Sequence, residues 1–196
     1  MASPPERPAG ARPRATPRAT SGAARKRPAA STAPAAAAPP SPPTWPAWRI
    51  ADGRYEPYSA VGASLVGGRW NSPGLGVIYA SRSYAGAMLE CLAQAGIGRV
   101  PRTQVAIEIA IPESVSVERL DEGVLPRGWD QADLRVARAL GDAWLRSRRT
   151  AVLVVRSVVA RKEFNVLINP AQPDFHTIVP AAPEPVIWDQ RLFGGR

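Results

Sequence analysis

Five polar or aromatic side chains stand in otherwise apolar, glycine-rich surroundings and could together bind and cleave a nucleotide. They are Arg49, Arg69, Tyr79, Glu90 and Ser157. The two guanidinium groups are planar forks that suit a diphosphate, and the aromatic ring could stack on a flat base. The carboxylate could stabilise the sugar cation that forms when a glycosidic bond breaks, and the hydroxyl could hydrogen-bond an amide or a ribose. This combination indicates a nucleotide-cleaving enzyme.

Each of these residues also has an ordinary structural interpretation. Arg49 follows Trp48 and could form a cation–π surface pair with it. Glu90 lies away from the apolar stripe of its helix, which by pattern alone favours a solvated surface side chain. Tyr79 is a common kind of core residue, and the hydroxyl of Ser157 could be satisfied by the backbone. The residue pattern leaves both interpretations open.

The elements that must hold these residues alternate irregularly between strands and helices. Apolar patterning predicts strands at 48–50, 76–80, 103–111, 151–159, 164–168 and 176–179. It predicts one helix from Ser81 or Ser83 to about Ala95, and another that Asp130 and Asp133 open and that ends in Arg146, Arg148 and Arg149. Residues 54–66 are predicted to be irregular. Because βαβ units do not recur, this order indicates an α+β domain with a mixed sheet core and flanking helices.

Two local patterns concern the surroundings of the candidate site. Gly67 and Gly68 permit unusual backbone torsions or a close approach just before Arg69. In the helix that carries Glu90, small neighbours would let another group reach the carboxylate. The residues of that helix that are predicted to pack inward share one face. They are Tyr84, Met88, Cys91, Leu92 and Ala95.

The first 44 residues differ in composition from the rest of the chain. They hold half of the 22 prolines, and seven Lys or Arg against a single acid, Glu6. We expect residues 1–44 to be a disordered basic tail and residues 45–196 to form one domain. The tail could bind nucleic acid weakly and non-specifically, or serve only as a solubilising linker.

Composition also argues against several classes of protein. We expect no membrane span or signal peptide, because no apolar run approaches the required length. The single cysteine, Cys91, excludes an internal disulfide and fits a reducing cytoplasm, which is the expected location. With one histidine, His176, a zinc site and a His-dependent nucleophile are improbable. We expect no metal and no cofactor, and we interpret His176 as a strand-edge residue.

Seven short blocks, in order, resemble the RES domain family, which is named for Arg, Glu and Ser. They extend over residues 45–193 and agree at the three defining positions, Arg49, Glu90 and Ser157. One block alone would be weak, but seven in the right order are specific. The blocks are Trp48-Arg49-Ile50, Gly68-Arg69-Trp70-Asn71, Val77-Ile78-Tyr79-Ala80-Ser81, Ala87-Met88-Leu89-Glu90, Ser157-Val158-Val159, Asn165-Val166-Leu167-Ile168-Asn169-Pro170 and Trp188-Asp189-Gln190-Arg191-Leu192-Phe193.

The resemblance implies an ADP-ribosyltransferase-like fold and a toxin of a toxin–antitoxin pair that consumes NAD⁺ as its substrate. It implies cleavage of the nicotinamide–ribose bond, with water, phosphate or a protein side chain as acceptor. Arg49 and Glu90 would then be catalytic, and Arg69, Tyr79 and Ser157 would bind the dinucleotide. The implied partner is an Xre-type antitoxin that blocks the pocket. Transfer of ADP-ribose to a macromolecule, a nucleic-acid-binding module and an inactive partner-binding domain remain alternatives.

Other polar residues of these blocks are interpreted structurally. Asn165 and Asn169 are expected to be sheet-end and turn residues, and Asp189 with Arg191 an ion pair. The arginines at 146–149 could bind phosphate, but cations in a last helical turn are favourable against the helix dipole in any case.

Overall fold

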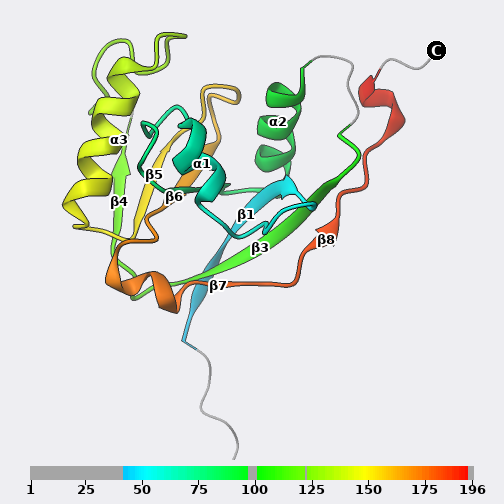
Figure 1. Cartoon of the computed structure of the whole chain (residues 1–196), viewed down its shortest axis with the longest axis horizontal. Helices are drawn as coiled ribbons and strands as arrows, with labels where there is room; N and C mark the ends of the chain where they lie inside the picture. The colour runs from blue at the N-terminus through cyan, green and yellow to red at the C-terminus, as the bar shows by residue number, and fades with distance from the viewer. Residues whose placement is uncertain (1–41, 97–100, 122, 194–196) are drawn as a thin grey trace, which may run out of the picture. The chain divides into compact units, whose positions relative to one another are not determined.

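A mixed sheet of eight strands organises the part of the chain that the structure describes, residues 42–96, 101–121 and 123–193 (Figure 1). The structure is a computed structural model, and the predicted tail at 1–44 lies almost wholly outside the described residues. In chain order the elements are β1 (Thr44–Asp52), α1 (Val61–Val66), β2 (Ile78–Ser81), α2 (Tyr84–Ala95), β3 (Gln104–Pro112), β4 (Val117–Leu120), α3 (Arg135–Ser147), β5 (Val152–Arg156), β6 (Phe164–Ile168), the 3-10 helix η1 (Pro173–Thr177), β7 (Val179–Pro180), β8 (Glu184–Pro185) and the 3-10 helix η2 (Gln190–Phe193). None of the helices in these ranges is long and apolar enough to cross a membrane.

The order of the strands confirms the predicted α+β class with a mixed sheet. Along the sheet the order is β4-β5-β6-β2-β1-β3-β7, and β8 also pairs with β3. Neighbouring strands run antiparallel except β4 and β5, which are parallel. The connections are therefore not the repeated crossovers of a doubly wound sheet.

The sheet is nearly divided between β1 and β2. These two strands share a single register position, at which Trp48 pairs with Ser81. By contrast, β1 pairs with β3 along its whole length, from Thr44 to Asp52. Beyond the Trp48–Ser81 pair the strands diverge, so backbone groups along the gap need other partners. The side chain of Arg49 is one of these partners, as shown below.

Two apolar layers cover the two faces of the sheet, and β5 belongs to both. Val152 and Val154 pack in one layer with the isoleucines of β3. Leu153 and Val155 pack in the other layer with Trp144 of α3. This confirms the prediction that the strand is buried on both sides. The strand is shorter than predicted, since it ends at Arg156 and leaves Ser157 at the start of the next loop.

Two predictions of local structure are wrong. Residues 54–66 were expected to be irregular but contain α1, which starts where the Ser59 hydroxyl accepts the Val61 amide and ends at Gly67 with φ +72°. The expected strand at 176–179 is largely replaced by η1, because Pro173 favours a helical start and the Gln172 side chain accepts the next amide. His176 therefore lies exposed in a 3-10 helix and not at a strand edge.

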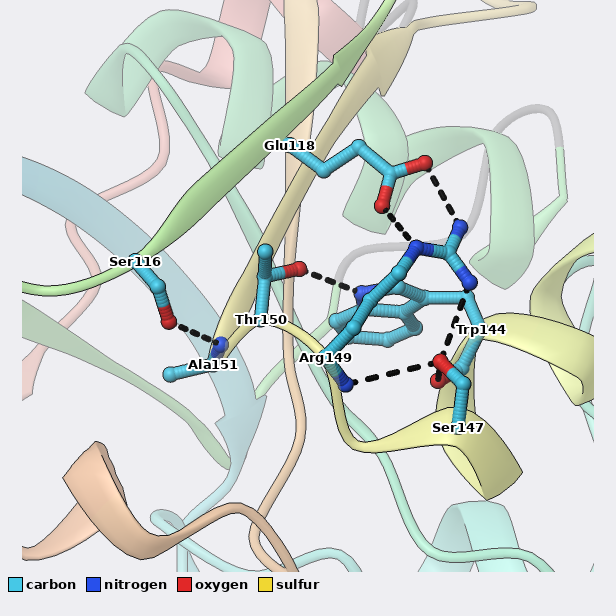
Figure 2. A network of polar contacts seen from close by, with 7 residues as sticks. All are labelled: Ser116, Glu118, Trp144, Ser147, Arg149, Thr150 and Ala151. Carbon is cyan, nitrogen blue, oxygen red and sulfur yellow. Dashed lines mark hydrogen bonds and ion pairs between the residues drawn. The ribbon is translucent and has the colours of Figure 1, made fainter.

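The C-terminal end of α3 is fastened to the sheet by a polar network (Figure 2). Trp144 donates from its indole nitrogen to Thr150 Oγ1 across 2.8 Å. Arg148 adopts a left-handed backbone that ends the helix, with φ 49°. Arg149 then binds both carboxylate oxygens of Glu118 on β4, at 2.6 and 2.7 Å. These contacts favour the structural interpretation of Arg149 over a phosphate site.

Candidate active site

Glu90 of α2 is held at the point where β5 ends and β6 begins. Its Oε1 atom accepts a hydrogen bond from the hydroxyl of Ser157 and another from the amide nitrogen of Asn165, both 2.7 Å long. No hydrogen bond from another described residue reaches its second oxygen, Oε2. One oxygen of the carboxylate is therefore fixed in place, and the other remains available to a ligand.

The Ser157 hydroxyl is oriented so that it donates its hydrogen bond to Glu90. The serine is 1% exposed and opens the loop between β5 and β6. Its oxygen accepts the backbone amides of Val159 and Ala160, at 3.1 and 2.9 Å. Because both acceptor positions of the hydroxyl are occupied, its one proton is left for Glu90. Ser157 is thus partly satisfied by the backbone, as the structural interpretation expects, and also holds the carboxylate.

Asn165 lies at the N-terminal end of β6, as predicted for a sheet-end residue, and its side chain also contacts Glu90. Ser81 on β2 and Asn165 on β6 are directly paired, and their side chains therefore lie on the same face of the sheet. The Ser81 hydroxyl donates to Asn165 Oδ1 across 3.0 Å. This bond turns the amide so that its NH₂ group points at Glu90. The signal in the sequence was two polar residues at the facing ends of apolar strands.

The helix α2 is placed by its N-terminal cap and by small residues. Ser83 accepts the Gly86 amide at 3.0 Å and donates to Glu163 in the β5–β6 loop at 2.9 Å. Gly86 and Ala87 are the buried residues of α2. The stripe predicted to pack inward is only half-buried, since the helix approaches the sheet through its small residues. This approach brings Glu90 onto Asn165.

Arg49 fills the gap between β1 and β2. Its Nη1 donates to the carbonyl of Tyr79 on β2 at 2.8 Å, and its Nε donates to the carbonyl of Pro57 at 2.6 Å. A longer contact of 3.4 Å joins Nη2 to the carbonyl of Ser59. Burial lowers the pKa of the Arg49 guanidinium. Trp48 packs edge-on against the Tyr84 ring, with centroids 5.3 Å apart, and makes no cation–π pair with Arg49 in the described ranges.

Tyr79 and Gly68 are in close contact. The Tyr79 hydroxyl donates to Asn71 Oδ1 at 2.7 Å and accepts the Trp70 amide at 3.0 Å. A Cβ atom on Gly68 would lie 2.5 Å from that hydroxyl oxygen, which confirms the predicted close approach. Burial raises the pKa of Tyr79 to about 12. These contacts favour the core interpretation of Tyr79.

Arg69 lies beside this cluster with part of its guanidinium unused. Its Nη1 donates to the carbonyls of Trp129 and Gln131, at 3.3 and 2.9 Å. Its Nε and Nη2 have no partner among the described residues. Arg69 therefore keeps donors that an anionic ligand could accept.

The structure brings the five predicted residues together in two groups. Glu90 contacts Ser157 directly, whereas Arg49 binds the Tyr79 carbonyl and the residue after Arg69 binds the Tyr79 hydroxyl. The groups are linked through β2, on which Tyr79 and Ser81 lie two positions apart and share a face. Within the described ranges, no hydrogen bond or ion pair joins Glu90 to either arginine.

The arrangement suits chemistry that develops positive charge near a fixed carboxylate. A carboxylate held by two donors does not need to reorganise when a cation forms beside it, which is the condition for electrostatic catalysis. In the described part of the chain, His, Cys, Asp and Glu form no group that could hold a metal ion.

Comparisons with known proteins agree with this fold and these motifs. The RES domain model matches residues 46–189. A Prs ADP-ribosylating toxin of Sphingobium sp. (strain YBL2) is 41% identical over 152 residues, which cover 74% of this chain and 94% of the relative. Toxin Res of Pseudomonas putida is 35% identical over 128 residues, which cover 64% of this chain and 85% of the relative.

A solved structure gives the same result for the fold. The crystal structure of the M. tuberculosis MbcT–MbcA toxin–antitoxin complex contains a chain that superposes with a TM-score of 0.62 at 18% identity. The match covers 73% of this chain and 84% of that chain. The α+β fold is therefore shared with a protein of known structure. By its motifs and its relatives, the chain belongs to the RES domain family.

Proposed function

We propose that this protein is a toxin of a toxin–antitoxin pair that cleaves the nicotinamide–ribose bond of NAD⁺. In this reaction the bond from the ribose C1′ to the nicotinamide nitrogen breaks, and its electron pair leaves with neutral nicotinamide. An acceptor oxygen then bonds to C1′ and loses its proton. With water as acceptor the enzyme is a glycohydrolase, and with inorganic phosphate it is a phosphorylase.

The observation that carries the proposal is the fixed carboxylate of Glu90. Ser157 and Asn165 both hold Oε1 at 2.7 Å, and Oε2 is the oxygen that would face the ribose. Positive charge that develops on the ribose ring is stabilised by this oxygen more in the transition state than in the ground state. In this proposal Ser157 acts mainly through Glu90 and not on the nicotinamide itself.

The two arginines take different roles in the proposal. Arg69 keeps free donors and would bind the diphosphate. Arg49 uses its donors on the carbonyls of Pro57, Ser59 and Tyr79. It would hold the 57–59 segment against β2 and supply positive charge from there. Tyr79 would hold the Gly68–Trp70 segment through its hydroxyl, rather than stack on a ring.

A second candidate is transfer of ADP-ribose to a macromolecule. The observation that favours it is the name of the Sphingobium relative, which is 41% identical and is called an ADP-ribosylating toxin. Both candidates share the first half of the reaction, the departure of nicotinamide. They differ in the acceptor, which is a small molecule in one case and a protein group in the other.

We further propose a cognate antitoxin of the Xre type as partner. Support comes from the shared fold of the chain in the MbcT–MbcA toxin–antitoxin complex. A toxin that consumes a central metabolite requires an inhibitor in the same cell. Co-expression with the product of the adjacent gene should restore growth, and growth arrest that persists would contradict the pairing.

The test is the product of NAD⁺ turnover by the full chain. Wild-type protein should release nicotinamide, and Glu90→Gln should lower the rate about 10²- to 10³-fold, the usual effect of removing one electrostatic stabiliser. Reactions with and without phosphate separate the two small acceptors. Radiolabelled NAD⁺ added to lysate separates these from transfer to protein, because only transfer leaves label on macromolecules.

Glu113→Gln is the matched control, because Glu113 is an exposed carboxylate outside the site. It should turn over NAD⁺ at the wild-type rate. Equal turnover by Glu90→Gln and wild type would remove Glu90 from the reaction. No nicotinamide from wild type under any of these conditions would exclude NAD⁺ cleavage altogether.

A further inference from the structure

A concave site that Glu90 does not line lies beside the N-terminal turn of α2. It has a volume of about 260 Å³, and its lining residues come from α2, β1, β3, β8 and the segment between β7 and β8. Glu90 reaches from α2 to Asn165 on β6, whereas the strand residues that line this groove lie on β1, β3 and β8. The lining residues are Trp48, Tyr84, Ala106, Glu108, Ala181, Ala182 and Glu184.

The groove is acidic although the chain is strongly basic. Glu108 and Glu184 both line it, and among the residues that the structure describes no Lys or Arg does, while the whole chain carries a formal charge of +9. Neither carboxylate takes part in an ion pair or side-chain hydrogen bond with the rest of the described structure. Both are exposed, and neither has a cationic partner among the described residues.

The sheet register places these carboxylates beside the aromatic part of the groove. Glu108 pairs directly with Trp48 across β1 and β3, and Glu184 pairs with Ala106 across β3 and β8. Paired residues present their side chains on one face, so both carboxylates stand over the same surface as the indole. Trp48 and Tyr84 are half-buried and pack edge to face, with an interplanar angle of 76°.

An aromatic surface flanked by unpaired carboxylates has the chemistry that recognises a cationic side chain. A guanidinium or ammonium group is attracted to the face of an indole or phenol ring. The same cation forms charge-assisted hydrogen bonds with carboxylates, and the methylene stem packs on apolar surface. The two carboxylates would repel a phosphate group, so their charge favours a cationic ligand over a nucleic acid here.

The size of the groove points to a side chain and not to a free small molecule. Pockets for small molecules usually measure about 300–1,000 Å³, and this groove falls below that range at about 260 Å³. A single extended side chain could fill it while its own backbone runs outside. We propose that the groove formed by Trp48, Tyr84, Glu108 and Glu184 is a docking site for an arginine or lysine side chain of a partner protein.

The test is a titration of the full chain with a short peptide that contains one arginine, followed by NMR on the ¹⁵N-labelled protein. The amide signals of Ala106, Ala181 and Ala182 should shift, since these residues line the groove. A lysine peptide should bind at the same place. A peptide in which citrulline replaces arginine keeps the shape and loses the charge, and should bind at least tenfold more weakly. Added salt should weaken binding of the charged peptides.

Glu108→Gln and Glu184→Gln should each lower the affinity for the arginine peptide about tenfold, whereas Glu113→Gln should leave this affinity unchanged. All three glutamates are exposed, so folding should be unaffected. Equal binding of the citrulline peptide, shifts elsewhere in the protein, or no binding at millimolar concentration would each overturn the proposal. The protein could also associate with itself, and this association could disappear in the double variant Glu108→Gln/Glu184→Gln. The occupant would then be a second copy of the chain, which would also overturn the proposal of a partner protein. Nicotinamide release by these variants should equal that of wild type, which separates this site from the proposed reaction.

Discussion

Ser157 donates its only hydroxyl proton to Oε1 of Glu90 across 2.7 Å, although the two residues are 67 positions apart in the chain. Two backbone amides occupy the acceptor side of the same hydroxyl, so its direction is set by the loop and not by chance rotation. The orientation of the carboxylate therefore depends on a loop that Glu90 does not belong to.

Replacing Ser157 should lower the turnover number more than it changes substrate affinity. Ser157→Ala removes one of the two donors to Glu90 and should reduce kcat for nicotinamide release about 10- to 100-fold, with KM nearly unchanged. Ser157→Thr keeps the hydroxyl and should recover part of the rate. An increase in KM with unchanged kcat would instead indicate that Ser157 binds the substrate directly.

Asn165→Asp should lower the turnover number for nicotinamide release. The variant replaces the NH₂ donor to Glu90 with a second carboxylate, so Oε1 loses one of the two hydrogen bonds that fix it. We expect kcat to fall about 10- to 100-fold with KM nearly unchanged, measured by nicotinamide release. A turnover number equal to that of wild type would show that Asn165 does not position Glu90 for the reaction.

Gly68→Ala should destabilise the protein through Tyr79. The new Cβ atom would stand 2.5 Å from the Tyr79 hydroxyl oxygen, and we expect a loss of about 1–3 kcal/mol in the free energy of unfolding. In a Tyr79→Phe background the loss should be smaller, because the closest atom is gone. A double-mutant cycle measured by urea unfolding gives this coupling, and a coupling energy near zero would contradict the contact.

Gly141 should be intolerant of any side chain. A Cβ atom there would overlap the backbone carbonyl of Trp70, against which α3 packs. Gly141→Ala should therefore lower the free energy of unfolding by at least about 3 kcal/mol. Gly62→Ala is the matched control: it also places alanine in a helix but meets nothing within 4 Å. It should be neutral or stabilise by up to about 1 kcal/mol. Similar losses in the two variants would contradict the packing of α3 on Trp70.

Two half-buried tyrosines should make the free energy of unfolding fall at alkaline pH. Burial raises the pKa of Tyr79 and of Tyr58 to about 12, from an ordinary value of about 10. The folded state thus binds protons that the unfolded state has lost, so this stabilising contribution is complete below pH 10 and disappears as the pH rises through 12. Urea unfolding between pH 8 and 11 should show the decline. Tyr79→Phe and Tyr58→Phe should each make it shallower, and an unchanged slope would contradict the burial.

Sequence patterns predicted those elements whose apolar residues follow one clear period. The strand at 103–111 alternates strictly and is β3, and the helix capped by Ser83 is α2 with Gly96 after it. The predicted ion pair of Asp189 with Arg191 is confirmed at 2.8 Å. β4, β7 and β8 are short strands with no such pattern, because their pairing depends on neighbours distant in the chain.

The sequence predicted which residues form the candidate site, but not how their side chains contact one another. Glu90 was ambiguous by pattern because its partners, Ser157 and Asn165, come from loop and strand positions 67 and 75 residues away. The apolar stripe of α2 suggested the wrong buried face, since small residues and not large ones set the approach to the sheet. The roles of Arg49 and Tyr79 depend on backbone carbonyls and amides, which leave no trace in the sequence.

The solitary rung at Trp48 and Ser81 means that hydrogen bonding does not run unbroken from one edge of the sheet to the other. The ladder of β4, β5, β6 and β2 and the ladder centred on β1 and β3 each protect their own amides, so we expect deuterium to enter the two at independent rates. Arg49 bridges β1 and β2 with its side chain: Nη1 donates to the Tyr79 carbonyl, in the place that a backbone amide of β1 would otherwise take. Loss of the hydrogen bond from Arg49 to the Tyr79 carbonyl would therefore weaken the junction of β1 and β2, while both hydrogen-bonded ladders stay intact.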